Sequence, residues 1–300
     1  MQRFLLHIVM FLVLVPRPAV AQSSRAGRKQ AQKVAVDSSE RRVFYSFCRA
    51  IDTTGHRRYR DCCLLEIGHR CSRDFSLLAD RCDSIAFESY RKNPDAGANL
   101  FGWMQPDERG FCEDYYMNYP ERGASLNSLH IVNTEYRFTE PVPEIEWRLH
   151  PTETRTLLGY DCRKATAEFR GRTWTAWFAP DIPVAFGPWK LGGLPGLILS
   201  AYDDRGYFTM EVTGTDTSCR PIFIYDDRPA DAKVRNVKRM KIVPTTRERV
   251  RTLQTLFWKD PVYLNELHGV ISAVHDRSGR IVIRKSGEVQ LPFIPPLELE

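Results

Sequence analysis

The chain is 300 residues long, with 43% hydrophobic and 11% aromatic residues, which excludes disorder throughout and is enough apolar material for a substantial core. It holds 43 Lys and Arg against 37 Asp and Glu, a formal net charge of +6. The excess lies wholly in residues 1–42 and leaves residues 43–300 neutral, so the folded part shows no electrostatic footprint for nucleic acid.

The amino-terminal residues predict export. Arg3 precedes an apolar run too short to cross a bilayer comfortably, and Ala19-Val20-Ala21 forms a small-residue cleavage site, so residues 1–21 are expected to be a signal peptide. Residues 22–42 are basic, without aromatics or apolar periodicity, and predict a flexible leader. Because no later stretch approaches about 18 uninterrupted apolar residues, we expect no transmembrane span in the mature chain. The expected location is the periplasm, the outer membrane surface or the exterior.

Export changes the interpretation of the cysteines. Eight follow the predicted cleavage site, and this even number in an oxidising compartment predicts up to four disulfides, with the pairing left open. Most of them fall in a cysteine-rich part over residues 43–130. The neighbours Cys62 and Cys63 would point to opposite faces of a strand and have different partners. The disulfide candidates are Cys48, Cys62, Cys63, Cys71, Cys82, Cys112, Cys162 and Cys219.

From Val43 onward, short apolar runs broken by charges and turn residues predict short strands. The pattern is clearest in a central part over residues 155–215, where it indicates an antiparallel meander. Two hairpins are expected there, with strands 157–169 and 172–178 joined at Arg170-Gly171, and strands 197–202 and 207–212 joined at residues 203–206.

One helix is expected near the carboxyl end, over residues 245–259. Thr245-Thr246-Arg247-Glu248 offers a capping box, and apolar residues from Val250 to Phe257 then share one helical face until Pro261. The predicted fold is therefore one mainly β (α+β) domain over residues 43–300. It is a twisted antiparallel sheet with this helix packed on it, stapled by disulfides.

The run from Gly187 to Ile198 is the most unusual segment. Pro195 and Gly196 occupy the central positions of an expected type II turn, and Gly192-Gly193 permits close approach of backbone. Trp189 can plug the end of the sheet or form the wall of a ligand site. The loop is interpreted either as a rigid closure of the sheet or as a binding rim. The candidate binding residues are Trp177, Gly187, Pro188, Trp189, Gly193, Leu194, Pro195 and Gly196.

A thiol or metal site is the sharpest chemical alternative. Thiolate and imidazole are the ligands of zinc and copper, but the spacing here matches no two-pair zinc pattern, and Cys-x-x-Cys does not occur. In an exported chain, disulfides beside surface histidines are favoured. His69 and Cys71, two apart, would share a strand face. The residues of this alternative are His56, Cys62, Cys63, His69 and Cys71.

Common catalytic motifs do not occur in the sequence, which has no nucleophile elbow, His-Glu-x-x-His, phosphate-binding loop or dinucleotide fingerprint. Glu140, Glu144 and Glu146 are interpreted as a solvated loop, and Asp203-Asp204 as a turn. An unrecognised hydrolase would need polar residues converging on a pocket. The sequence therefore predicts no catalytic residue and no cofactor.

The central block resembles the GLPGLI family of exported Bacteroidetes proteins, named after the run that stands here at residues 193–198. Further motifs of this resemblance lie upstream and downstream, and together they cover about residues 43–300. They are Leu65-Glu66-Ile67-Gly68, Cys82-Asp83-Ser84-Ile85, Gly159-Tyr160-Asp161-Cys162, Phe169-Arg170-Gly171-Arg172, Ala176-Trp177-Phe178, Gly187-Pro188-Trp189-Lys190, Pro244-Thr245-Thr246-Arg247-Glu248 and Pro296-Leu297-Glu298-Leu299-Glu300.

The resemblance implies an envelope protein without an established activity. Many members are encoded near TonB-dependent outer-membrane receptors, and a similar domain accompanies the catalytic module of one bacterial peptide-N-glycosidase type. It thus implies a non-catalytic binding or accessory role, with an outer-membrane receptor or another envelope protein as partner. Because the chain lacks catalytic motifs and the loop 187–198 is rigid and carries Trp189, that loop is the expected recognition element. Asp52-Thr53-Thr54 and Asp83-Ser84-Ile85 also resemble the O-glycosylation acceptor of Bacteroidetes, which would place sugars on Thr53 or Ser84.

Overall fold

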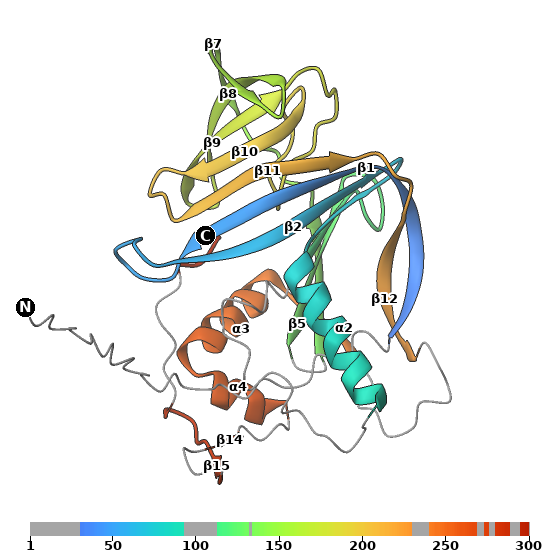
Figure 1. The fold of residues 1–300 in the computed structure, drawn as a ribbon, viewed down its shortest axis with the longest axis vertical. Helices are drawn as coiled ribbons and strands as arrows, with labels where there is room; N and C mark the ends of the chain where they lie inside the picture. The colour runs from blue at the N-terminus through green and yellow to red at the C-terminus, as the bar shows by residue number, and fades with distance from the viewer. Residues whose placement is uncertain are drawn as a thin grey trace, which may run out of the picture.

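A computed structural model describes residues 31–92, 113–131, 134–229, 240–268, 273–275, 280–288 and 295–299. The predicted signal peptide and Cys112 lie outside these residues. The described part is mainly β, as the sequence predicts, with one large sheet and a few helices (Figure 1). Its strands are β1 (Ala31–Ala50), β2 (Arg58–Gly68), β3 (Ser72–Ser76), β4 (Glu113–Met117), β5 (Ala124–Ile131), β6 (Thr134–Pro141), β7 (Arg148–Leu157), β8 (Tyr160–Phe169), β9 (Arg172–Ala179), β10 (Leu197–Asp203), β11 (Phe208–Asp216), β12 (Pro221–Pro229), β13 (Lys241–Pro244), β14 (Ala273–His275) and β15 (Ile281–Ile283).

The large sheet is formed by 13 strands, and its order is not the order of the sequence. It runs β13-β6-β5-β4-β3-β2-β1-β11-β10-β9-β8-β7, with β12 paired to β1, and β14 and β15 form a separate pair. Its pairs are antiparallel, except that β13 runs parallel to β6. Strand β1 joins the two halves, because its Val43 pairs with Leu65 of β2 on one side and with Thr215 of β11 on the other.

The predicted flexible leader is wrong for residues 31–42, which form the first part of β1. Ala31 is buried beside Tyr225 and Met240, and Val34 and Val36 pack on a cluster around Tyr116. Residues 31–42 hold too few apolar side chains to show the alternating pattern of a strand. They are extended because β12 pairs with them through backbone hydrogen bonds and packs against them.

Both predicted hairpins are confirmed. Arg170 and Gly171 have φ values of 53° and 73° between β8 and β9, as a tight hairpin turn with two left-handed residues requires. Strands β10 and β11 also pair as expected. The first hairpin begins later than predicted, since Leu158 and Gly159 (φ 48° and 83°) turn the chain between β7 and β8.

The predicted carboxyl-terminal helix is α3, Arg247–Lys259, whose N-cap Thr246 accepts a hydrogen bond from the Arg249 amide at 3.3 Å. It packs its apolar face on Leu129 and Phe138 of the sheet, as predicted. A short helix α4 (Pro261–Leu267) follows directly, capped by Asp260. Helix α2, Leu77–Lys92, follows β3 and is not among the predicted elements.

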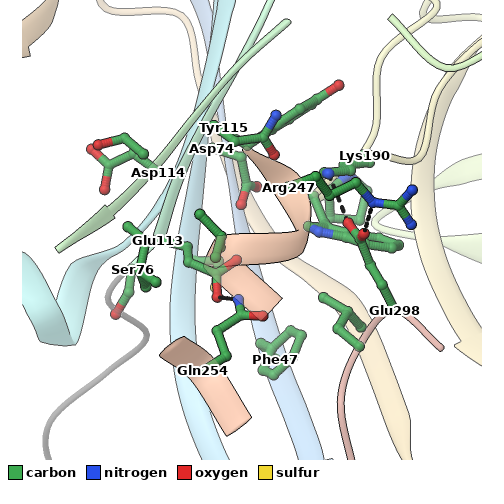
Figure 2. A pocket seen from close by; sticks show the side chains of 18 of the residues that line it. Phe47, Asp74, Ser76, Glu113, Asp114, Tyr115, Lys190, Arg247, Gln254 and Glu298 are labelled. Atoms are coloured by element: carbon green, nitrogen blue, oxygen red, sulfur yellow. Dashed lines mark hydrogen bonds and ion pairs between the residues drawn. The ribbon is translucent and has the colours of Figure 1, made fainter. Parts of the chain in front are cut away.

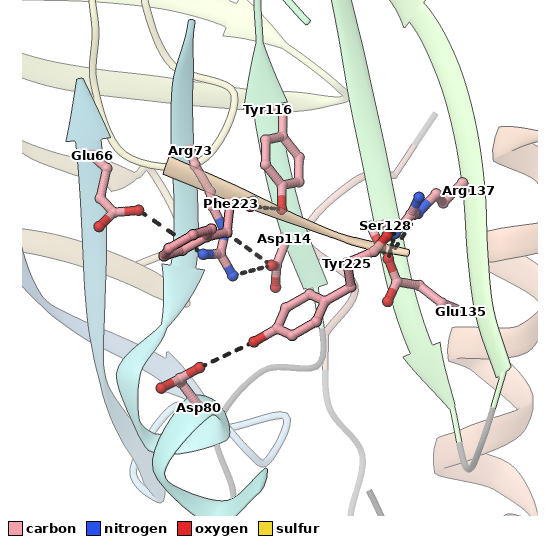
Figure 3. Close-up of polar contacts among 10 residues, drawn as sticks. All are labelled: Glu66, Arg73, Asp80, Asp114, Tyr116, Ser128, Glu135, Arg137, Phe223 and Tyr225. Atoms are coloured by element: carbon pink, nitrogen blue, oxygen red, sulfur yellow. Dashed lines mark hydrogen bonds and ion pairs between the residues drawn. The ribbon is translucent and has the colours of Figure 1, made fainter. Parts of the chain in front are cut away.

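The two sides of the sheet have different covers around β3 and β4. Helix α3 lies over the side to which Asp74 and Tyr115 belong (Figure 2). Strand β12 crosses the opposite side, over Arg73 and Asp114 (Figure 3). There Arg73 lies between acids, 2.6 Å from Asp114 and 3.9 Å from Glu66, and 4.0 Å from the Phe75 ring centroid. The Tyr116 hydroxyl donates to the Phe223 carbonyl at 2.9 Å, which fixes β12 over these charges.

The predicted disulfides are not found among the described cysteines, which are free thiols. The sheet register explains this, because the cysteines face other residue types across the strands. Cys48 is opposite Arg60, Cys62 is opposite Ser46, and Cys63 is opposite Ser76. Cys62 and Cys63 do point to opposite sides, as predicted, one half-buried and the other buried. The described free thiols are Cys48, Cys62, Cys63, Cys71, Cys82, Cys162 and Cys219.

A search of the described helices for a stretch long and apolar enough to cross a membrane finds none.

Candidate functional site

The loop 187–198 packs into the core. The Trp189 ring lies 5.7 Å from the rings of both Phe169 and Trp174, and only 9% of the residue is exposed. Leu194 is also buried, whereas Gly193 and Pro195 are exposed and Trp177 is half-buried on β9. The loop therefore closes the sheet. Its inner side, Pro188-Trp189-Lys190, faces a pocket.

The expected type II turn at Pro195-Gly196 does not form. The Gly196 amide donates to the Leu194 carbonyl at 2.8 Å, closing a three-residue turn, and Gly196 does not have a positive φ. Glycine is required there because a Cβ would lie 2.3 Å from the Ala179 carbonyl oxygen. The left-handed positions of the loop are instead Trp189 and Gly193, with φ values of 55° and 84°.

The pocket lies between the sheet, helix α3, the loop and the carboxyl-terminal segment 295–299, and has a volume of about 80 Å³ (Figure 2). Its walls are mostly apolar. The polar side chains converge on it from β3, β4, the loop, α3 and the carboxyl-terminal segment (Figure 2). The apolar walls include Phe47, Leu129, Phe138, Trp189, Met210 and Val250, and the polar groups include Asp74, Glu113, Lys190, Gln254 and Glu298.

Asp74 is the most unusual group of the pocket. Its carboxylate accepts a hydrogen bond from the Trp189 amide, but its Oδ2 is buried without any hydrogen-bond partner. Burial raises the pKa of this carboxyl to about 7, against an ordinary 3.8, and the negative charges of Asp114 and Asp61 act in the same direction. The positive charge of Arg73 acts in the opposite direction, but no described cation forms an ion pair with Asp74. Asp74 thus keeps an open hydrogen-bonding position.

Glu113 is a second acid that forms no ion pair with a described residue, although the charges of Lys190 and Arg49 act on it. It belongs to β4 and accepts a hydrogen bond from the Gln254 amide of α3. Burial raises the pKa of Glu113, and the charge of Glu298 adds to the shift. The pocket thus combines two acids that are poorly solvated and not ion-paired within the described part of the chain.

The charged groups at the carboxyl-terminal side form ion pairs, although Nη2 of Arg247 is buried without a hydrogen-bond partner. The Lys190 ammonium lies 2.7 Å from both Glu140 and Glu298, and Arg247 lies 2.8 Å from Glu298. Burial raises the pKa of Glu298, but Lys190 and Arg247 outweigh it, and the net pKa lies below the ordinary value. The expectation of a solvated Glu140 is therefore wrong, since Glu140 also pairs with Arg170 at 3.1 Å.

The residues of the thiol or metal alternative are not brought together. His56 is exposed, and His69 is exposed beside Glu40 at 3.1 Å. His69 and Cys71 lie in the turn between β2 and β3, where Cys71 is buried, so they do not share a strand face. Within the described ranges, no three His, Cys, Asp or Glu side chains are placed to hold a metal ion.

The thiols themselves are poorly suited to exchange chemistry. Burial raises the pKa of Cys63 well above its ordinary value, and that of Cys71 to about 12. A thiol is reactive as its thiolate, so these groups are held in the unreactive form.

The two predicted glycosylation acceptors differ in access. Thr53 is exposed in the turn between β1 and β2. Ser84 is half-buried in α2, and its hydroxyl donates to the Asp80 carbonyl at 2.9 Å.

The pKa of Asp74 predicts a pH-dependent stability. Between pH 4 and 7 the folded chain holds a proton on Asp74 that the unfolded chain has released, so this carboxyl lowers stability as the pH rises through that window. At pH 8 we expect Asp74→Asn to increase the free energy of unfolding by at least about 1.4 kcal/mol, the equivalent of one pKa unit. The gain should shrink as the pH falls toward 4. Urea unfolding at pH 4.5 and pH 8 measures it, and an identical change at both pH values would contradict it.

Comparisons with known proteins identify only a short part of the chain. Residues 168–200 match a family described as "Protein of unknown function (Porph_ging)". No match was found among curated proteins. Two crystal structures of PNGF-II, in space groups P21 and C2, are similar over 72% of this chain at 15% identity and a TM-score of 0.45. The chain covers 33% and 32% of those chains, about a third of their length.

Proposed function

We propose that this chain is an exported envelope protein of the GLPGLI type that binds a small ligand in the pocket under α3 without converting it. The observation that carries the proposal is the unpartnered Oδ2 of Asp74, buried in mostly apolar walls. Ligand sites combine apolar walls with a few placed polar groups, and a buried acceptor without a donor costs stability unless a ligand uses it.

The short family match, over residues 168–200, supports this proposal because it includes residues 193–198. The GLPGLI family is named after the run at those residues. The loop that holds these residues also forms part of the pocket wall through Pro188-Trp189-Lys190. An accessory role beside a TonB-dependent outer-membrane receptor, in the periplasm or at the cell surface, is the setting that we propose for this binding.

Binding is favoured over catalysis because the groups near Asp74 lack an activated nucleophile. The Ser76 hydroxyl donates to Asp61 at 3.0 Å, and the Tyr45 hydroxyl donates to the Ile198 carbonyl at 2.7 Å. Burial keeps the Cys63 thiol protonated by raising its pKa. Asp74 or Glu113 could serve as a base, but a base without a reacting partner is insufficient for a hydrolase.

Filling the pocket should abolish binding without unfolding the chain. We expect wild type to bind at least one of three fragments of similar size, benzylamine, benzyl alcohol and benzoate, and Gln254→Trp to lose that binding because the indole occupies the pocket. Ligand-observed NMR measures both. Thr252→Trp, on the exposed side of the same helix, is the matched control and should bind as wild type does. Binding that survives in Gln254→Trp, or no binding in wild type, contradicts the proposal.

A further inference from the structure

Asp74 and Glu113 together leave negative charge in the pocket without a counter-ion. Both carboxylates point into the same space (Figure 2), and among the described residues neither forms an ion pair. The nearby acids have partners, Asp114 with Arg73 at 2.6 Å and Glu298 with Lys190 at 2.7 Å. Arg73 acts on Asp74, and Lys190 and Arg49 act on Glu113, only from beyond ion-pair distance. A positive group supplied from outside would therefore find two acceptors that form no ion pair with a described side chain.

The pocket already stabilises one ammonium group by the same chemistry. The Lys190 ammonium lies 5.7 Å and 5.5 Å from the ring centroids of Tyr115 and Phe138 while it pairs with Glu140 and Glu298. Aromatic faces attract cations, and more strongly where water is excluded. Near Asp74, Tyr115 lies directly opposite on β4, and Trp189 is joined to Asp74 through its amide, so aromatic residues line this part of the pocket too.

The volume limits the size of a ligand. A space of about 80 Å³ is about half of the roughly 150 Å³ cavity that encloses a benzene molecule. The pocket therefore holds the polar group of a ligand and part of its apolar body, and the rest lies at the open side of the pocket. The apolar walls favour a body without further polar groups, and the open Oδ2 of Asp74 requires a donor.

We infer that the pocket binds the ammonium group of a small primary ammonium compound whose apolar body it partly encloses, and that Asp74 is its counter-ion. The inference rests on the proposed function and specifies its ligand class. The ammonium donates to the open Oδ2, Glu113 adds a second negative charge, and the apolar body lies between the aromatic walls. A charged pair formed inside such a pocket is a stronger interaction than a neutral hydrogen bond.

The test compares benzylamine, benzyl alcohol and benzoate on the wild-type chain at pH 8, where Asp74 is ionised and benzylamine is protonated. The three fragments share the ring and differ in the charge of the polar group. We expect benzylamine to bind at least tenfold more tightly than benzyl alcohol, and benzoate to bind most weakly. Titration calorimetry or ligand-observed NMR gives the dissociation constants.

Two variants assign the effect to Asp74. Asp74→Asn keeps the shape and removes the charge, so benzylamine should lose at least tenfold in affinity and its preference over benzyl alcohol. Asp204→Asn removes a charge from an exposed turn and should change nothing. The wild-type comparison does not depend on either variant folding.

The outcomes separate the two claims. Benzyl alcohol or benzoate binding as tightly as benzylamine, and blocked by Gln254→Trp, would overturn the ammonium inference and leave the binding function in place. An unchanged preference for benzylamine in Asp74→Asn would overturn the role of Asp74. No binding of any fragment to wild type would overturn the binding function itself.

Discussion

Replacing Arg172 by alanine is expected to lower the free energy of unfolding by about 3–5 kcal/mol. Arg172 lies 2.8 Å from Asp203, and the two side chains are 1% and 0% exposed. Its guanidinium also donates to the carbonyls of Pro296 and Leu297. The alanine variant leaves Asp203 buried without its cation, and that uncompensated charge is the main cost. Urea unfolding at pH 7 measures the loss.

The matched control is Arg155→Ala, which breaks an ion pair of the same length, 2.8 Å to Glu211, between side chains that are 38% and 44% exposed. Because water solvates the remaining glutamate, we expect a loss below about 1 kcal/mol. Similar losses for the two variants would show that burial of the Arg172–Asp203 pair is not what makes it important.

Replacing Trp189 by alanine is expected to lower the free energy of unfolding by about 3–5 kcal/mol, the range for deletion of a buried aromatic side chain. The ring packs against Phe169 and Trp174 in the main core. If Trp189 served only as an exposed binding rim, its replacement by alanine would lower the free energy of unfolding by about 0.5 kcal/mol or less.

The control for Trp189 is phenylalanine, which keeps an aromatic ring at the same position. Trp189→Phe should retain more than half of the stability that alanine loses, with an unchanged dependence of unfolding on urea concentration. A folded Trp189→Ala variant as stable as wild type would return the loop to the role of a pure recognition element.

The sequence is sufficient for elements whose signals are local. The turn at Arg170-Gly171 needs two left-handed residues in a row, and the alternating strand 172–178 follows at once, so this hairpin is visible in the chain. The same holds for α3, which has a capping residue, an apolar face and a proline directly after its end. In these segments, the residues that determine the local structure lie within about ten positions of one another in the sequence.

The pocket is not visible in the sequence because its parts come from distant segments. Its polar side chains meet only after the sheet has placed β3 and β4 under α3. These side chains are Asp74, Glu113, Lys190, Gln254 and Glu298. A weak signal did exist at Asp74, since an acid inside a short run of strand residues must be solvated, paired or functional. The predicted disulfides and the predicted flexible leader failed for the same reason. The register between strands and the pairing of β12 with β1 are set by tertiary contacts, which the local sequence does not show.

The position of β1 also affects the order in which the chain can fold. Its residues are synthesised well before those of its partners, because Arg42 pairs with Asp216 across 174 residues, and the earlier half of β1 pairs with β12, which ends at Pro229. A pairing across such a separation forms slowly because the loop must close before contacts compensate for it. During synthesis, one edge of β1 thus stays open until β11 and β12 have been made. The growing chain therefore presents an unpaired strand edge, the kind of surface that chaperones bind and that other copies can join.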